Sequence, residues 1–192
     1  NFHLAPEYLA WQMRAILDDT ARWGAGTSYA NEHVMVEYTD PNPFKAFHIG
    51  HLMSNTIGES LARLIENAGA EIVRANYQGD LGVHAACAIW GMKKLNLDPQ
   101  SADDFGRAYA AGATAYREDE AAKKEIDEIN KKLYARSDEE LNKLYDTGRK
   151  ASLEAFERIY ATLGTKFDHY FFESETGPVG KKIVEEHPET FP

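Results

Sequence analysis

The stretch HVMVEYTDPNPFKAFHIGH, residues 33–51, decides how this chain folds. Its side chains alternate between two faces from residue 33 to residue 39, with the two valines and Tyr38 on one face, which is the period of a β-strand. Residues 40–43 then read Asp-Pro-Asn-Pro, and neither proline can donate a backbone N–H group to a sheet ladder. Residues 33–39 are therefore predicted to form a strand that ends in a loop.

A helix and a second strand follow this loop. From Gly50 the apolar residues recur at helical spacing, and Gly69 is predicted to end the helix. Residues 71–77 form the next predicted strand. A strand, a loop, a helix and a strand of these lengths make a βαβ unit, which favours parallel pairing with a right-handed crossover. We predict an α/β fold, an incomplete Rossmann-like parallel sheet with a largely helical insertion.

The flanking segments are predicted to be mostly helical. A helix is expected at residues 6–23, and four of its apolar residues at helical spacing are predicted to lie in the core: Leu9, Met13, Ile16 and Leu17. Helices are also expected from residue 83 to 94 and from 137 to 163, and a short β segment at 166–172 precedes a last helix at 178–186. Two capping boxes are predicted to open insertion helices: Ser101 with Asp104, and Ser137 with Glu140.

Composition limits the class of protein. The net charge of −10 argues against a self-contained RNA-binding protein, because phosphate contacts depend on Lys and Arg. Cys87 is the single cysteine, which excludes an intrachain disulfide and a thiolate metal cluster. No apolar run is long enough to span a bilayer, so no membrane partner is expected. A cytoplasmic location is the simplest prediction.

Residues 45–51 carry the candidate chemistry, because they lie where the end of the first strand leads into a helix N-terminus. Ligands bind at this edge of open α/β sheets, and the free N–H groups of a helix start attract phosphate. His48 and His51 can donate hydrogen bonds to phosphate oxygens as charge develops there. Lys45 adds a mobile positive charge, and Gly50 leaves room for a flat base. The alternatives are a surface histidine pair and a chance metal site.

Residues 48–51 read His-Ile-Gly-His, which is the HIGH signature of class I aminoacyl-tRNA synthetases. Related nucleotidyltransferases carry a variant of it, but the block from residue 37 to residue 82 resembles the core of the arginyl-tRNA synthetases. The stretches 2–24 and 156–175 are similar to the segments that precede and follow this core in that family. The resemblance therefore extends over nearly the whole chain and implies an arginine–tRNA ligase.

The family resemblance implies roles for the residues of the signature. His48, His51 and Lys45 would be catalytic, and these three with Gly50 would bind ATP. ATP would enter with Mg²⁺ as a substrate, with no tightly bound cofactor and no protein metal site. The other expected partners are L-arginine and tRNA(Arg), the latter bound mainly by domains missing here. In this family tRNA is usually bound before the adenylate forms.

The resemblance also implies an arginine-binding set in the loop after the first strand. Glu37 and Asn42 match residues of the family that hold the amino acid, and a carboxylate can bind a guanidinium group through two hydrogen bonds. Asp40 and Pro41 lie between them, and His51 is expected nearby. Asp40 departs from the small residue that is usual in the family, so it either attracts a cation or caps the loop.

The resemblance divides the chain into four predicted segments. Residues 1–32 would be the end of an N-terminal extra domain with a linker helix, and residues 33–82 the first half of a Rossmann-like catalytic domain. Residues 83–164 would be the helical insertion, and residues 165–192 a truncated return to the catalytic core. Such a fragment would carry half an active site and be inactive alone. A second hypothesis is a non-catalytic module, derived from a class I synthetase, that binds a nucleotide or a partner protein; a synthetase for another amino acid or a small nucleotidyltransferase is a further alternative.

Overall fold

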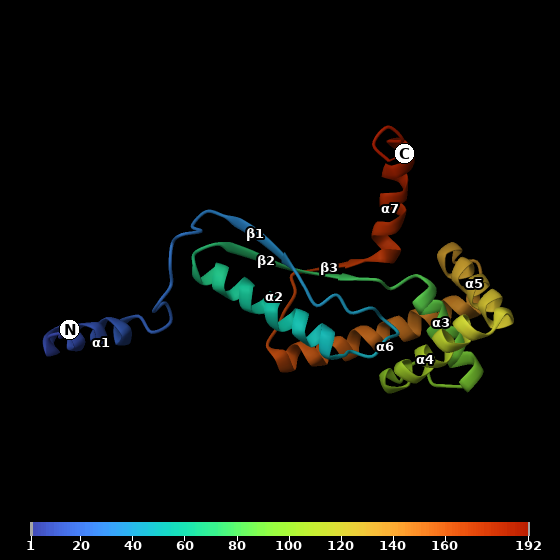
Figure 1. The fold of residues 1–192 in the computed structure, drawn as a ribbon, viewed down its shortest axis with the longest axis horizontal. Helices are drawn as coiled ribbons and strands as arrows, with labels where there is room; N and C mark the ends of the chain where they lie inside the picture. Colours follow the sequence, from blue (N-terminus) through green and yellow to red (C-terminus); the bar gives the residue numbers. More distant parts are fainter. Residues whose placement is uncertain (1, 192) are drawn as a thin grey trace.

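The computed structural model describes residues 2–191, and a parallel β-sheet forms its centre (Figure 1). The strands are β1 (His33–Glu37), β2 (Glu71–Gln78) and β3 (His169–Phe172). They lie in the order β1-β2-β3, and both neighbouring pairs are parallel. The predicted α/β class with a parallel sheet is confirmed. Residues 1 and 192, at the outer ends of the predicted segments 1–32 and 165–192, lie outside the described residues.

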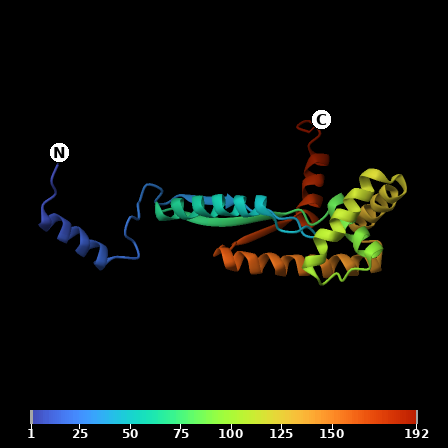
Figure 2. The ribbon, with the colours of Figure 1, turned by 60° about the horizontal axis from the view of Figure 1, so that its bottom comes forward.

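The helices lie along and beyond this sheet. Their bounds are α1 (Pro6–Asp18), α2 (Ile49–Asn67), α3 (Val83–Leu95), α4 (Ala102–Glu118), α5 (Glu120–Ala135), α6 (Glu139–Leu163) and α7 (Glu173–Glu186). The predicted crossover is α2, and α3–α6 form the predicted helical insertion between β2 and β3. Figure 2 shows α3, α4 and α5 gathered beyond one end of the sheet, while α6 runs back below it. Within residues 2–191, no helix has both the length and the apolar character needed to cross a bilayer.

An aromatic cluster closes one face of the sheet and fixes the end of β1. Tyr38, Phe156, Tyr160 and Phe167 are each at most 5% exposed. Helix α2 comes very close to this cluster, since a Cβ atom added at Gly58 would lie 2.2 Å from Cγ of Tyr38. Only a residue without a side chain permits this approach. The candidate site therefore begins at a rigid point of the fold.

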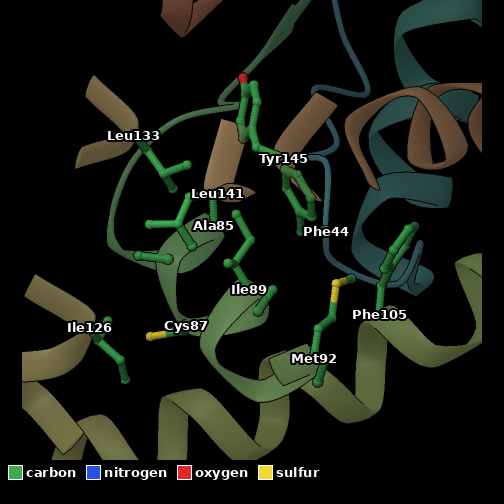
Figure 3. Packing of buried hydrophobic residues seen from close by; sticks show 13 residues of the cluster. Phe44, Ala85, Cys87, Ile89, Met92, Phe105, Ile126, Leu133, Leu141 and Tyr145 are labelled. Atoms are coloured by element: carbon green, nitrogen blue, oxygen red, sulfur yellow. The ribbon is translucent and has the colours of Figure 1, made fainter. Parts of the chain in front are cut away.

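A second core lies inside the insertion and includes Phe44, a residue of the loop after β1 (Figure 3). Phe44 is 0% exposed, and its ring centroid lies 6.0 Å from that of Phe105 and 5.6 Å from that of Tyr145. The backbone N–H of Phe44 donates to Oγ of Ser152 in α6 at 2.9 Å. The loop and the insertion thus share one hydrophobic core, so they are positioned together.

Two glycines allow α3 and α4 to pack closely. A Cβ atom added at Gly91 would lie 2.0 Å from the carbonyl oxygen of Ala108, and one added at Gly112 would lie 2.0 Å from that of Cys87. Backbone atoms cannot move aside as a flexible side chain can, so this helix crossing requires a glycine at each position. The same contact buries Cys87.

The N-terminal helix differs from its prediction in length and in burial. Helix α1 ends at Asp18, so the prediction of a helix to residue 23 is wrong. The sequence Asp-Asp-Thr at residues 18–20 has low helix propensity, which favours this early end. The predicted core face is also wrong, because Leu9, Met13 and Leu17 are 48%, 63% and 73% exposed. Both ribbon views show α1 apart from the sheet and the insertion, so no described element covers its apolar residues.

Both predicted capping boxes are wrong, although helices begin near the predicted places. Ser101 precedes α4, but its side chain makes no capping hydrogen bond. Helix α6 is capped by Asp138, whose Oδ1 accepts from the N–H of Leu141 at 3.2 Å, and not by Ser137. An ionised carboxylate one residue nearer to the helix is the stronger acceptor. The predicted stop of α6 at Gly164 is confirmed.

The last two elements are shifted from their predicted limits. Strand β3 covers residues 169–172 of the predicted segment 166–172. Just before it, Asp168 makes two hydrogen bonds with the backbone of Arg74 in β2. The N–H of Asp168 donates to the carbonyl oxygen of Arg74, and the N–H of Arg74 donates to Oδ2 of Asp168, both at 2.8 Å. Helix α7 begins at Glu173, and Pro178 lies inside it rather than at its start.

Candidate active site

The loop after β1 is held in an unusual backbone conformation. Thr39, Asp40 and Phe44 have positive φ angles of 80°, 46° and 66°. Such angles are uncommon for residues other than glycine, and they cluster at functional sites. The N–H of Thr39 donates to Oγ of Ser54 at 3.0 Å, and the N–H of Tyr77 donates to Oδ1 of Asp40 at 2.9 Å. Contacts with α2 and β2 therefore hold the loop in a shape that local propensity disfavours.

His48 and His51 cap the start of α2 reciprocally. Nδ1 of His48, the N-cap residue, accepts from the N–H of Gly50 at 3.1 Å. Nδ1 of His51 accepts in turn from the N–H of His48 at 3.2 Å. The two rings are stacked, with centroids 3.8 Å apart and planes 16° apart. The two histidines that the sequence singles out are thus brought together at the helix N-terminus.

This capping fixes the proton of each neutral histidine ring. A backbone N–H group can only donate, so both Nδ1 atoms must be unprotonated acceptors, and each neutral ring then carries its proton on Nε2. Two Nε2–H donors therefore remain at a helix start that already favours negative charge. Such a pair can bind phosphate oxygens without either ring having to gain or lose a proton.

The electrostatics of the site keep His51 neutral. Burial lowers the pKa of His51 to about 4, and electrostatic interactions with His48 and Lys45 act in the same direction. At neutral pH the ring is therefore a hydrogen-bond donor and not a cation. The positive charge at this place comes from Lys45 and from the helix N-terminus.

A titration would test this neutrality. We expect the His51 ring signals in an NMR titration to stay constant from pH 8 to pH 5.5 and to shift with a midpoint near 4. The Lys45→Met variant removes one repelling charge, so its midpoint should be higher. Because the unfolded chain takes up this proton near the ordinary histidine pKa of about 6.5, the contribution to folding stability falls as the pH drops from about 6.5 to 4. A midpoint at or above 6.5 would contradict the assignment.

Two carboxylates lie at the end of β1. Glu37 is the last residue of the strand and is exposed, while Asp40 is partly buried. Burial raises the pKa of Asp40, the hydrogen bond from the N–H of Tyr77 opposes this rise, and the negative charge of Glu37 adds to it. Asp40 thus ties the loop to β2 through the N–H of Tyr77, and its predicted attraction for a cation stays a prediction. The repulsion between the two carboxylates also marks a place that would favour a cation.

Asn42 joins this loop to the turn after β2. Its Oδ1 accepts from the N–H of Gly79 at 3.1 Å, so its amide nitrogen is the part left for a ligand. His84 contacts the same turn, with Nε2 2.7 Å from the carbonyl oxygen of Gly79. Pro41 is fully buried, and its contact with arginine stays a prediction. A Cβ atom added at Gly79 would lie 2.5 Å from Oδ1 of Asn42, so a larger residue there would displace the Asn42 side chain.

Gly50 and Lys45 complete the predicted set. A Cβ atom added at Gly50 would lie 3.0 Å from Cε1 of His48, so this glycine makes room for the histidine ring, and its contact with a base stays a prediction. The side chain of Lys45 extends from the loop to the insertion, where its Nζ lies 4.8 Å from the ring centroid of Tyr109 in α4. The sequence did not indicate this contact, because nothing near Lys45 in the chain points to a residue of α4.

Asp80, in the turn after β2, has a structural role. Its carboxylate is 0% exposed. Oδ2 accepts from Tyr145 at 3.0 Å, from Nε of Arg149 at 2.8 Å and from Oγ of Ser174 at 2.7 Å, while Oδ1 accepts from the N–H of Ser174 at 2.8 Å. A buried charge satisfied by this many donors holds the turn at residues 79–82 against α6 and α7.

Comparison with known proteins agrees with this geometry. The family model described as tRNA synthetases class I (R), catalytic domain, matches residues 12–186. An arginine–tRNA ligase of Borrelia garinii is 29% identical over 93% of this chain and 32% of its own length, and one of Bdellovibrio bacteriovorus is 32% identical over 73% and 26%. The chain thus spans about a third of the length of the curated relatives it matches.

Solved structures give the same result. The crystal structure of arginyl-tRNA synthetase from Plasmodium falciparum superposes with a TM-score of 0.61 at 25% identity, covering 84% of this chain and 28% of that one. A putative arginyl-tRNA synthetase from Campylobacter jejuni superposes with a TM-score of 0.62 at 18% identity, covering 97% and 40%, which supports the fold. Since the family model covers most of the chain, this protein belongs to the family of class I (R) tRNA synthetase catalytic domains.

Proposed function

We propose that this chain carries the signature half of the active site of an arginine–tRNA ligase. In the first step, a carboxylate oxygen of L-arginine attacks the α-phosphorus of ATP, and the bond to the bridging oxygen of pyrophosphate breaks. Arginyl-adenylate and pyrophosphate result. In the second step, a ribose hydroxyl at the tRNA 3′ end attacks the carbonyl carbon, loses its proton and releases AMP. Catalysis of this kind depends on positioning and on charge stabilisation.

The observation that carries the proposal is the reciprocal cap of His48 and His51. It presents two Nε2–H donors at the start of α2. In the proposed reaction these donors stabilise the phosphate oxygens as negative charge builds up on them, and Lys45 assists with its ammonium group. Mg²⁺ arrives with ATP, bound by the phosphates and by water.

The proposed arginine site lies at the end of β1. The carboxylate of Glu37 binds the guanidinium group, and Asp40 adds negative potential beside it. The amide nitrogen of Asn42 faces the substrate, since its oxygen is occupied by Gly79. Further contacts to arginine and most contacts to tRNA(Arg) would come from other parts of an enzyme of the relatives' length. In this proposal residues 33–82 are the catalytic half-domain, and residues 83–164 are its helical insertion.

Calorimetric binding tests the proposal directly. A non-hydrolysable arginyl-adenylate analogue is titrated into the protein beside its lysyl and glutaminyl counterparts, with His51→Ala as the control. We expect selective binding of the arginyl compound and its loss in the control. Equal binding of all three analogues would contradict arginine selection but retain a nucleotide site. Absence of binding of all three analogues to an enzyme of the relatives' length would favour a module without this chemistry.

Substitution of Glu37 tests arginine selection. Glu37→Gln keeps the shape of the side chain but removes its charge, so the charge-assisted hydrogen bonds to guanidinium are lost. We expect kcat/KM for arginine in aminoacylation to fall about 10- to 100-fold, mainly through KM, with little change in KM for ATP. Glu71→Gln, at the opposite end of the neighbouring strand, is the matched control and should behave like the wild type. An unchanged KM for arginine in Glu37→Gln would sink the assignment.

A further inference from the structure

Lys45 is fixed at its backbone by the residue before it. Phe44 is fully buried in the core of the insertion, and its N–H is bound by Ser152 of α6. The next residue, Ala46, lies against α4, since a Cβ atom added at Gly106 would be 3.5 Å from Cβ of Ala46. The chain on both sides of Lys45 therefore packs against the insertion, so the reach of the lysine is set by α4 and α6.

The ammonium group of Lys45 lies over an aromatic ring. Its Nζ is 4.8 Å from the ring centroid of Tyr109, which is in van der Waals reach of the ring face. Tyr109 is partly buried and packs against the insertion core, so its ring is held in place. A cation at this distance from a tyrosine face is attracted by the ring quadrupole.

This contact holds the charge of Lys45 without neutralising it. Among the ion pairs that residues 2–191 form, none includes Lys45. A carboxylate partner would compete with phosphate for the ammonium group, whereas an aromatic ring leaves the full positive charge available. The chain has a net charge of −10, so carboxylates are plentiful, and an aromatic partner for a lysine is a distinct arrangement.

We propose that Tyr109 of α4 is a positioning residue for the reaction, one that holds the Lys45 ammonium in place for the phosphates of ATP. The inference rests on the proposed function. It gives the helical insertion an indirect part in the reaction, because a residue of α4 sets where a charge from the signature loop lies. In this proposal Tyr109 acts through Lys45 and not on the substrate.

The test uses the complete enzyme in an ATP–pyrophosphate exchange assay with tRNA and arginine present. We expect Tyr109→Leu to lower kcat/KM for ATP about 3- to 10-fold, with KM for arginine unchanged. Tyr109→Phe keeps the ring and should restore most of the activity. In a Lys45→Met background, Tyr109→Leu should have no further effect, because the charge that the ring holds is gone. Tyr109→Met, which is flexible, replaces Tyr109→Leu if the latter lowers the melting temperature.

Each result decides the proposal. If Tyr109→Leu lowers kcat/KM for ATP equally with and without Lys45, Tyr109 has a packing role and the proposal is overturned. The proposal also fails if Tyr109→Phe is no more active than Tyr109→Leu, or if Tyr109→Leu has wild-type activity. A readout without activity separates this inference from the proposed function. With ¹³C-labelled lysine, the Cε protons of Lys45 should be shifted upfield by the ring in the wild type and in Tyr109→Phe, but not in Tyr109→Leu. An inactive wild type that shows this shift refutes the function alone, and a missing shift refutes the positioning.

Discussion

Replacement of His51 by alanine is expected to lower the kcat of arginine activation about 10²- to 10³-fold, because it removes one of the two Nε2–H donors. The variant also loses the Nδ1 acceptor that caps the N–H of His48, so about 0.5–2 kcal/mol of folding stability should be lost with it. Pyrophosphate exchange measures the first effect, and chemical denaturation measures the second.

A glutamine at residue 51 separates the two effects. Glutamine at the third helical position accepts from the N-cap N–H as it does in ordinary capping boxes, but it places no Nε2–H at the same point. His51→Gln should therefore keep the stability of the wild type while its kcat stays low. If the alanine variant retains normal exchange activity, His51 has no catalytic role.

The second large effect is expected at Phe44. Its side chain is fully buried between α4 and α6, and the ring fills the space over Gly148, where a Cβ atom would lie 2.5 Å from Cε1 of Phe44. Phe44→Ala should lower the free energy of unfolding by about 3–5 kcal/mol, since the insertion core cannot collapse onto the cavity. This is a large part of the stability of an ordinary domain, which is about 5–15 kcal/mol.

Urea denaturation of the protein and its variants measures this loss. Phe44→Leu keeps most of the apolar volume and should lose clearly less stability than Phe44→Ala. Lys166→Ala, at an exposed loop position, is the surface control and should stay within about 0.5 kcal/mol of the wild type. A loss below 1 kcal/mol in Phe44→Ala would mean that the loop and the insertion do not share a core.

Much of the fold and the centre of the site follow from local pattern. The alternation before Pro41 gives β1, the helical period after Gly50 gives α2, and the signature between them gives the histidine pair. These features are local, because the period, the breakers and the motif lie within a few turns of chain. The predicted strand and helix are both present for this reason, although β1 ends at Glu37, two residues before its predicted limit, because Thr39 has a positive φ angle.

The contacts that complete the site are not local. Phe44 and Ser152 are 108 residues apart in the chain, and Asp80 and Ser174 are 94 apart. Phe44 lies between a proline and a lysine in a loop, so no periodicity of apolar residues predicts that it is buried. The error at α1 has the opposite origin, since Leu9 and Met13 do form an apolar face, but periodicity does not show whether another element covers it.

The glycine contact between α3 and α4 has a consequence for how this insertion can vary. Gly91 of α3 contacts the backbone of α4, and Gly112 of α4 contacts the backbone of α3, so each helix needs a glycine in the other for this close packing. The two helices therefore have to be inherited or engineered as a pair. A graft that takes only one of them from a relative with a larger residue at the crossing would push the helices apart, and Tyr109 would move with α4.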